Sequence, residues 1–188
     1  PEQKKKKRVL SKDEIARVQK IASDRTDEMY EIACITMVLY YTGMRINELL
    51  TLRRDDVDLQ NGYIVGGEKT DAGRERTIPI LAPIKMILAD WMLDSVGSEL
   101  LLPPKRKGKK RSDSGVEKAF KKLMQRCGIE EAVPHTMRRT ATTRLVEGKA
   151  EPTAVQAIIG HADFSTTADY YTGHDVDYLK SEMEKFHE

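Results

Sequence analysis

Apolar residues recur every three or four positions over much of this chain, which is the spacing of amphipathic helices. The first such segment places Ile15, Val18 and Ile21 on one side. Ser11 stands just before it and is a typical N-cap residue, and acidic residues occupy the turn that follows. We therefore predict a helix that begins after Ser11.

A nearly continuous apolar stretch predicts a second, more deeply buried helix from about Thr26 to Tyr41. The Thr42-Gly43 pair should end it, because glycine is the common residue just beyond a helix. A short helix is expected from about Arg45 to Leu52. The acidic residues at 55–58 are interpreted as its polar exit.

The hydrophobic period then changes from helical to alternating. Residues 62–67 read Gly-Tyr-Ile-Val-Gly-Gly and residues 76–80 read Arg-Thr-Ile-Pro-Ile, with a turn-rich stretch at 69–74 between them. Two short strands around such a stretch predict a small antiparallel hairpin.

The rest of the chain returns to the helical pattern. Helices are predicted at about 82–96, 114–127, 136–147, 151–159 and 176–186, with an extended segment at 100–103 and a loop at 104–114. The expected fold class is therefore mainly α with a small antiparallel β-sheet.

Composition narrows the class of protein. The 188 residues suffice for one domain with a core, and 39% hydrophobic with 33% charged residues is typical of globular chains. The sequence has no apolar run long enough to cross a bilayer and no signal-peptide pattern at its start, so we expect a cytoplasmic location. The two cysteines, Cys34 and Cys127, fit no metal spacing and are expected to be reduced.

The net charge is only +2, but the basic residues are unevenly distributed. They form two clusters, Lys4, Lys5, Lys6, Lys7 and Arg8, and Lys105, Arg106, Lys107, Lys109, Lys110 and Arg111. Taken alone, each cluster reads as a solvated arm or loop. From the clusters alone this solvated interpretation is favoured, although on a nearly neutral chain the two also fit a basic face of the kind that contacts DNA phosphates.

Four separate segments carry polar residues in unusual settings. They hold Arg45 with Glu48, then Lys69 before the hairpin turn, then His135 with Arg138, and last Gly160-His161 followed by Tyr170 and Tyr171. Residues three apart share a helix face, and a helix start favours anions. Each segment alone has an ordinary structural explanation, but their combination does not.

The order Arg, Lys, His-x-x-Arg, Gly-His, Tyr in a mainly helical chain resembles the tyrosine recombinase family, which includes phage- and transposon-type integrases. The motifs that carry the resemblance are TGMRINELLTL, HTMRR and IIGHADFSTTADYYT, and it extends from about residue 9 to the end. It implies the DNA breaking-rejoining catalytic-domain fold. It also implies a site-specific recombinase that cleaves and rejoins DNA through a 3′-phosphotyrosine.

The resemblance also implies a role for each site residue. Arg45 and Arg138 would clamp the phosphate, which suits the bidentate guanidinium group. His135 would handle the proton of the attacking phenol, His161 would donate a hydrogen bond to the phosphate, and Lys69 would protonate the leaving oxygen. Glu48 would support the site by orienting Arg45 or a histidine.

The nucleophile is one of two adjacent tyrosines. Family members place it nine or ten residues after the Gly-His histidine, and Tyr170 and Tyr171 fit one spacing each. We assign Tyr171, because the family's tyrosine is commonly followed by Thr or Ser, as Tyr171 is by Thr172. The sequence departs from the family at Gly173 and at Arg139, where histidine is common.

The implied partner is double-stranded DNA with specific recombination sites, bound by a tetramer of copies, with accessory DNA-bending proteins as further partners. The resemblance implies no cofactor, metal or membrane. Within the cytoplasm, it implies that the protein is associated with the nucleoid. The alternatives are a non-catalytic DNA-binding module with the same fold, a type IB topoisomerase-like enzyme, and a structural helical protein whose motifs match the family by coincidence.

The resemblance also predicts how the chain is divided. Residues 1–8 would be a basic interdomain linker and residues 9–188 the catalytic domain, and we expect an N-terminal core-binding domain to belong to the longer natural protein. The C-terminal helix, about 176–186, carries one apolar stripe. That stripe could pack on a neighbouring protomer or on its own domain.

Overall fold

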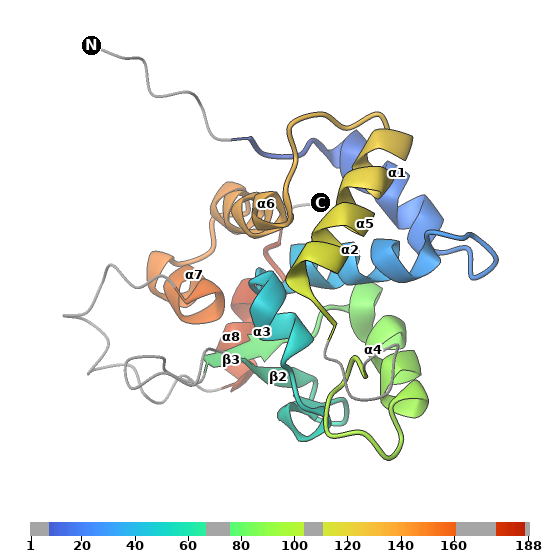
Figure 1. The fold of residues 1–188 in the computed structure, drawn as a ribbon. Helices are drawn as coiled ribbons and strands as arrows, with labels where there is room; N and C mark the ends of the chain where they lie inside the picture. The colour runs from blue at the N-terminus through green and yellow to red at the C-terminus, as the bar shows by residue number, and fades with distance from the viewer. Residues whose placement is uncertain (1–7, 67–75, 104–110, 161–175, 187–188) are drawn as a thin grey trace, which may run out of the picture.

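The computed structural model describes residues 8–66, 76–103, 111–160 and 176–186 (Figure 1). The helices are α1 Lys12–Ala22, α2 Tyr30–Thr42, α3 Ile46–Leu50, α4 Ala82–Asp94, α5 Asp113–Arg126, α6 Pro134–Glu147, α7 Pro152–Ile159 and α8 Val176–Met183. A short 3-10 helix, η1, spans Arg54–Asp56, and the strands are β1 Val57–Asp58, β2 Tyr63–Gly66 and β3 Arg76–Pro79. The predicted class, mainly α with a small antiparallel sheet, is confirmed.

The predicted cap of α1 is present. The Glu14 amide donates to the Ser11 hydroxyl at 3.2 Å, and the Ser11 amide donates to the Glu14 carboxylate at 2.8 Å. This reciprocal pair satisfies two amides that have no partner inside the helix. It fixes the first turn of α1, whose Ile15 and Val18 face the core.

Helix α2 is the centre of the core. Every residue from Ile32 to Thr42 is buried, and the helix contacts α1, α4, α5 and α6 (Figure 1). A helix that is apolar on all sides must be enclosed by other elements, which explains the position of this segment. Helix α2 begins four residues later than predicted. Polar turns precede it, in which the Thr26 amide donates to Asp24 and the Met29 amide to Asp27.

The sheet has three strands in the order β1-β2-β3, both pairs antiparallel. Ile64 of β2 faces Val57 on one side and Ile78 on the other, and both isoleucines are fully buried. The β2–β3 pairing confirms the predicted hairpin. The interpretation of residues 55–58 as a polar exit was wrong, because Val57 is an apolar residue that pairs with β2.

Helices α4 and α5 both pack against α2, and the segment at 100–103 lies between them in the sequence. Of the segment predicted to be extended, Leu100 forms a β-bridge with Arg53 and the Leu101 amide donates to the Leu52 carbonyl at 2.9 Å, but residues 101 and 102 form a bend. The loop predicted to run to residue 114 ends earlier. Ser112 caps α5 by accepting from the Gly115 amide at 3.2 Å, so the helix begins at Asp113.

The C-terminal helix packs against its own domain. Helix α8 contacts β3 and α7, and the ring of Phe186 lies against Tyr40 and Tyr41 of α2 at centroid distances of 5.2 and 5.4 Å. Gly148 allows this approach, because a Cβ there would collide with the Lys185 carbonyl. The regular helix ends at Met183, three residues before the predicted end.

None of the helices within the described ranges has the length and apolar character needed to cross a membrane.

Candidate active site

Arg45 lies between the end of α2 and the start of α3. Its backbone is extended, so it is the N-cap of α3 and not a helical residue as predicted. It still meets Glu48, because its amide donates to one carboxylate oxygen at 2.9 Å and its Nη1 donates to the other at 3.0 Å. The side chain of Arg45 is 41% exposed, whereas that of Glu48 is only 1% exposed.

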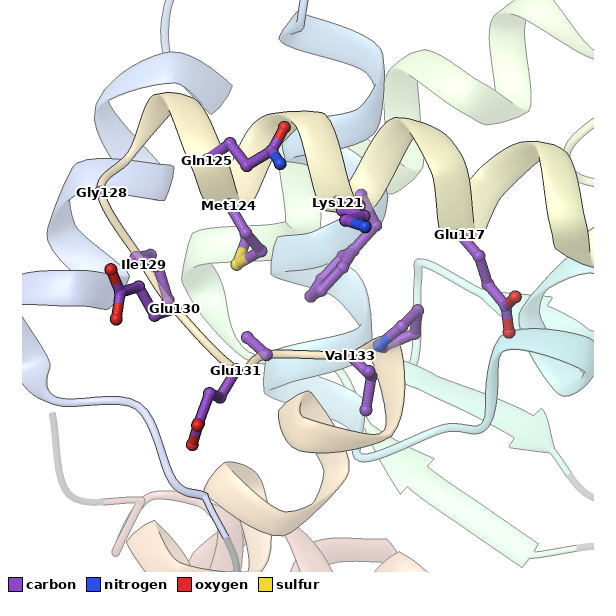
Figure 2. A pocket seen from close by; sticks show the side chains of 12 residues that line it. Glu117, Lys121, Met124, Gln125, Gly128, Ile129, Glu130, Glu131 and Val133 are labelled. Carbon is purple, nitrogen blue, oxygen red and sulfur yellow. The ribbon is translucent and has the colours of Figure 1, made fainter.

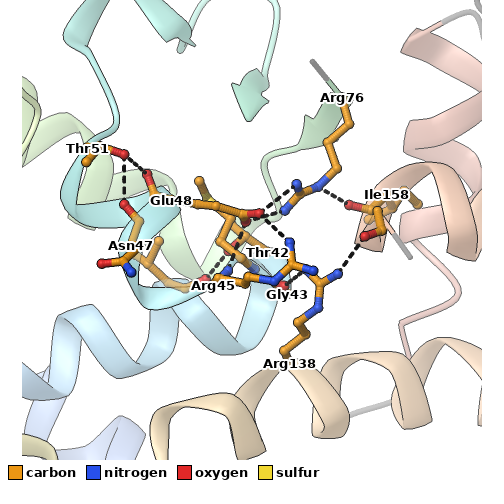
Figure 3. Close-up of polar contacts among 12 residues, drawn as sticks. Thr42, Gly43, Arg45, Asn47, Glu48, Thr51, Arg76, Arg138 and Ile158 are labelled. Atoms are coloured by element: carbon orange, nitrogen blue, oxygen red, sulfur yellow. Dashed lines mark hydrogen bonds and ion pairs between the residues drawn. The ribbon is translucent and has the colours of Figure 1, made fainter. Parts of the chain in front are cut away.

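Arg138 reaches the same place from the buried side of α6. Its Nη1 donates to the Gly43 carbonyl and its Nη2 to the Gly160 carbonyl, both at 2.8 Å (Figure 3). These glycines are the C-caps of α2 and α7, whose last carbonyls lack partners within their helices. One guanidinium group therefore ties together the ends of two helices.

The two glycines belong to the TGMR and GH motifs, and both have positive φ, 63° at Gly43 and 71° at Gly160. A Cβ on Gly43 would collide with the side chain of Ile159 in α7. The missing side chain at Gly43 lets α7 approach the end of α2. The glycines thus bring Arg45, which follows α2, close to the last turn of α7.

Burial lowers the pKa of Arg138 to about 10, and the nearby positive charges of Arg76 and Arg45 add to this effect, while Glu48 opposes it. At neutral pH the group is still protonated. Three guanidinium groups and one carboxylate leave a net charge of +2 in this cluster. The cluster is therefore a strongly positive point on the molecule, suited to an anion.

Arg76 is the member of this cluster that the sequence interpretation missed. It is the first residue of β3, and its Nη1 and Nη2 donate to the two oxygens of Glu48 at 3.2 and 2.6 Å (Figure 3). Burial works to raise the pKa of Glu48, but the hydrogen bonds and charge of Arg76, together with the Arg45 amide and the charge of Arg138, outweigh it. The pKa of Glu48 therefore lies below its ordinary value. The expected partner Arg45 is present as well. No sequence spacing links Arg76 to Glu48, because they meet only through the packing of β3.

His135 lies in the first turn of α6, as predicted, and its side chain is exposed. Arg138 follows three residues later on the buried side. The Thr136 hydroxyl accepts from the Val133 amide at 3.1 Å, which helps fix this first turn. The histidine is therefore presented to solvent from a well-anchored helix start.

Four predicted site residues lie outside the described residues: Lys69, His161, Tyr170 and Tyr171. The structure does describe residues that border them in the chain. Arg76 begins the strand after the segment that holds Lys69, and Gly160, which Arg138 binds, precedes His161.

Comparisons with known proteins identify the family. A model of the phage integrase family matches residues 8–177, which is most of the chain. The chain belongs to the phage integrase family. It is 31% identical to the tyrosine recombinase XerD of Listeria innocua serovar 6a over an alignment of 194 positions, which covers 96% of this chain and 62% of that protein.

Solved structures of recombinases share the fold of this phage integrase domain. A XerA recombinase crystal structure matches with a TM-score of 0.71 and 26% identity, over 98% of this chain and 66% of that one. The Tn1549 transposon integrase in complex with circular intermediate DNA matches with a TM-score of 0.70 and 21% identity, over 97% and 67%. The second likeness, at this identity, shows the fold alone. The predicted tyrosine recombinase catalytic-domain fold is thereby confirmed, and the chain spans less than two thirds of its XerD relative.

Two residues of the basic clusters are described, and both are engaged within the integrase domain. Arg8 forms an ion pair with Glu14 and donates to the Glu130 carbonyl at 3.2 Å. Arg111 pairs with Glu31 at 2.6 Å and donates to the Pro103 carbonyl at 3.0 Å. These contacts hold residues 8 and 111 against the rest of the domain. The other cluster residues, at 4–7 and 105–110, lie outside the described ranges.

A surface pocket of about 790 Å³ lies between α5 and the segment that leads into α6 (Figure 2). Its apolar residues include Phe120 and Met124, and Glu117, Glu130 and Glu131 line it as well. Lys121 also lines the pocket, but three carboxylates against this one ammonium group would repel a phosphate. None of the described site residues lines the pocket, so it is separate from the arginine cluster.

Within the described residues there is no group of histidine, cysteine and acidic side chains that could hold a metal ion. Cys34 and Cys127 are both free and buried, as expected for core residues. Burial raises the pKa of both thiols, which makes the reactive thiolate form less accessible.

Proposed function

We propose that this chain is the catalytic domain of a site-specific DNA recombinase that cleaves and rejoins DNA strands through a covalent 3′-phosphotyrosine. The observation that carries the proposal is the meeting of Arg45 and Arg138 around Glu48 (Figure 3). The two arginines come from distant motifs. Their convergence is what a phosphate-binding site requires.

The arginine cluster suits the charge that develops during phosphoryl transfer. Attack on a phosphodiester places negative charge on the non-bridging oxygens, and fixed guanidinium donors stabilise it. Arg45 is 41% exposed, so it can reach a phosphate that approaches from solvent. Arg138 uses only two of its five N–H groups on the glycine carbonyls, which leaves donors for a phosphate oxygen.

In the proposed reaction, the phenolic oxygen of Tyr171 attacks the phosphorus and forms the phosphotyrosine bond. The bond between phosphorus and the 5′ oxygen breaks, and the leaving oxygen takes a proton from Lys69. His135 accepts the phenolic proton, and His161 donates a hydrogen bond to the phosphate. Attack by the 5′-hydroxyl of a second strand reverses these steps, so bond energy is conserved and no nucleotide cofactor is needed.

We further propose that the whole protein acts on double-stranded DNA with specific recombination sites, as a tetramer of copies associated with the nucleoid and with accessory DNA-bending proteins. Support comes from the XerD relative, which is named a tyrosine recombinase, and from the solved Tn1549 transposon integrase, which is in complex with DNA. The basic residues at 4–7 and 105–110 supply the charge for contacts to the DNA backbone.

Covalent capture tests this function and finds the target site in the same experiment. The protein is incubated with a library of nicked duplexes that carry random central sequences, and DNA that stays attached in SDS is sequenced. We expect a small set of related sites. The variant Arg138→Lys should form adducts about 100-fold more slowly, because lysine lacks the planar fork with which Arg138 spans two separate carbonyls and still offers donors to a phosphate.

The matched control is Arg126→Gln. Arg126 also forms a two-bond pair, with Asp27, but at the opposite end of α2 from the cluster. It should react like the unchanged protein. Salt-sensitive binding without any adduct would instead indicate a non-catalytic DNA-binding module. Adducts with DNA of arbitrary sequence, together with relaxation of supercoiled DNA, would indicate a topoisomerase.

A further inference from the structure

Arg76 makes three hydrogen bonds with two different elements. Besides the two bonds to Glu48, its Nε donates to the carbonyl of Ile158 in the last turn of α7 at 2.9 Å. The side chain is only 8% exposed, in contrast to Arg45 at 41%. All three nitrogens of the Arg76 guanidinium group therefore already bond to protein acceptors, whereas the two glycine carbonyls engage only Nη1 and Nη2 of Arg138.

Glu48 joins Arg76 to Arg45. A carboxylate has about four lone-pair positions, and Glu48 accepts four bonds, two from Arg76 and two from Arg45. The carboxylate is thus fully occupied and has one orientation that satisfies all donors. Arg76 supplies two of these four bonds and so sets the orientation of the carboxylate. That orientation in turn sets the position of Arg45, which forms the other two bonds.

Arg76 also determines where α7 ends. Arg76 binds the Ile158 carbonyl and Arg138 binds the Gly160 carbonyl, so both arginines hold the same helix end. Gly160 packs closely against Arg76: a Cβ on Gly160 would lie 3.0 Å from the Cδ and 3.2 Å from the Nη1 of Arg76. The next residue along the chain is His161, and the segment to Tyr171 follows it.

We propose that Arg76 is a positioning residue for DNA cleavage, which orients Arg45 through Glu48 and fixes the helix end that precedes His161. It acts through other residues and does not touch the phosphate. This inference rests on the proposed recombinase function. It assigns a role to a residue in the strand that follows the hairpin turn, outside the motifs that carry the family resemblance.

Single-turnover cleavage measures this role directly. Captured DNA sites are used with protein in excess, so that the maximal rate of adduct formation and the DNA dissociation constant are obtained separately. Arg76→Gln and Arg76→Lys should both lower the maximal rate by about 100-fold, as a misplaced site does, and change the dissociation constant by less than about threefold. Lysine should not rescue, because it lacks the planar fork.

Hydrogen exchange in the absence of DNA supplies a second reading. Amides in the last turn of α7, including the Gly160 amide that bonds to Gln156, should exchange faster in both Arg76 variants. The control is Arg126→Gln, which removes an ion pair with two hydrogen bonds to Asp27 at the other end of α2. It should change neither the cleavage rate nor the exchange at α7.

Should a single change at Arg76 unfold the protein, the paired change Arg76→Met with Glu48→Leu removes both buried charges and is measured in its place. The paired variant should fold, and its maximal cleavage rate should be as low as that expected for the single Arg76 variants. A folded Arg76 variant with the wild-type cleavage rate would overturn the inference, and a loss confined to DNA affinity would make Arg76 a DNA contact. If the wild-type protein forms no adduct, the proposed function fails, which is a distinct result.

Discussion

At the scale of single residues, Glu48 is the group on which the arginine cluster depends. It is a buried carboxylate with a partner on each side, Arg45 and Arg76. A buried ion pair does not stabilise a protein merely by existing, but removing one partner leaves an uncompensated charge. The energetic role of Glu48 is therefore best seen by neutralising it.

Glu48→Gln should lower the free energy of unfolding at pH 7 by about 3 kcal/mol, because Arg76 remains buried without its counter-charge. The pKa of Glu48 lies below its ordinary value in the folded state, so its stabilising contribution is present above the ordinary value, about 4.3, and is lost as pH falls through the folded pKa. Urea unfolding from pH 7 to pH 3 measures this.

The difference between wild-type and Glu48→Gln should stay constant down to about pH 5 and shrink below it. The exposed Glu184→Gln is the control and should show no difference at any pH. A difference that grows on acidification would show that the carboxylate is not held in its charged form by the arginines.

At the scale of elements, the arrangement depends on how closely the end of α2 approaches α7. Gly43 and Gly128 have nearly the same positive φ, 63° and 62°, but only Gly43 has a neighbour where a Cβ would be placed. The two positions therefore separate backbone strain from steric contact between helices.

Gly128→Ala should cost about 1 kcal/mol of unfolding free energy, which is the cost of a left-handed alanine. Gly43→Ala should cost about 1–3 kcal/mol more, because its methyl group would push Ile159 and α7 away. Thermal unfolding of both variants measures the difference. Equal losses would mean that α7 does not pack on the end of α2 as described.

The packing of α8 against its own domain gives a second prediction at this scale. Phe186→Ala should lower the unfolding free energy by about 3 kcal/mol, because the ring is buried against Tyr40 and Tyr41. Leu93→Ala, at an exposed position on α4, should change it by less than about 0.5 kcal/mol. An unaffected Phe186 variant would favour the other expected arrangement, in which this end packs on a neighbouring copy.

Local features of these elements could be predicted from the sequence and long-range ones could not. Ser11 capping α1 and Glu48 meeting Arg45 involve residues three positions apart, which sequence spacing reveals. The pairing of Glu48 with Arg76 spans 28 positions and arises only from packing. Strand β1 was missed for a similar reason, since two residues carry too little pattern to separate a strand from a turn.

At the scale of the whole molecule, charge distribution decides how the chain meets DNA. The net charge of +2 gives little general attraction, so binding depends on the basic clusters. Arg111 differs from its cluster neighbours, because it is paired with Glu31 and anchors the segment before α5. We expect it to contribute to folding and not to DNA affinity.

Changing Lys105, Arg106, Lys107, Lys109 and Lys110 together to glutamine should reduce the salt dependence of DNA binding. Affinity falls as salt rises, and each lost phosphate contact makes the plot of log affinity against log salt less steep by about 0.9. Arg111→Gln should leave that slope unchanged, and filter binding at several salt concentrations measures both. An unchanged slope in the fivefold variant would remove this segment from the DNA interface.

The covalent bond to Tyr171 is the central claim, and mass spectrometry of the trapped protein–DNA adduct tests it most directly. After digestion of protein and DNA, a nucleotide should be found on the phenolic oxygen of Tyr171 through its 3′ phosphate, and Tyr171→Phe should abolish the adduct while Tyr170→Phe retains it. A nucleotide on Tyr170, on another residue, or attached through a 5′ phosphate would contradict the account.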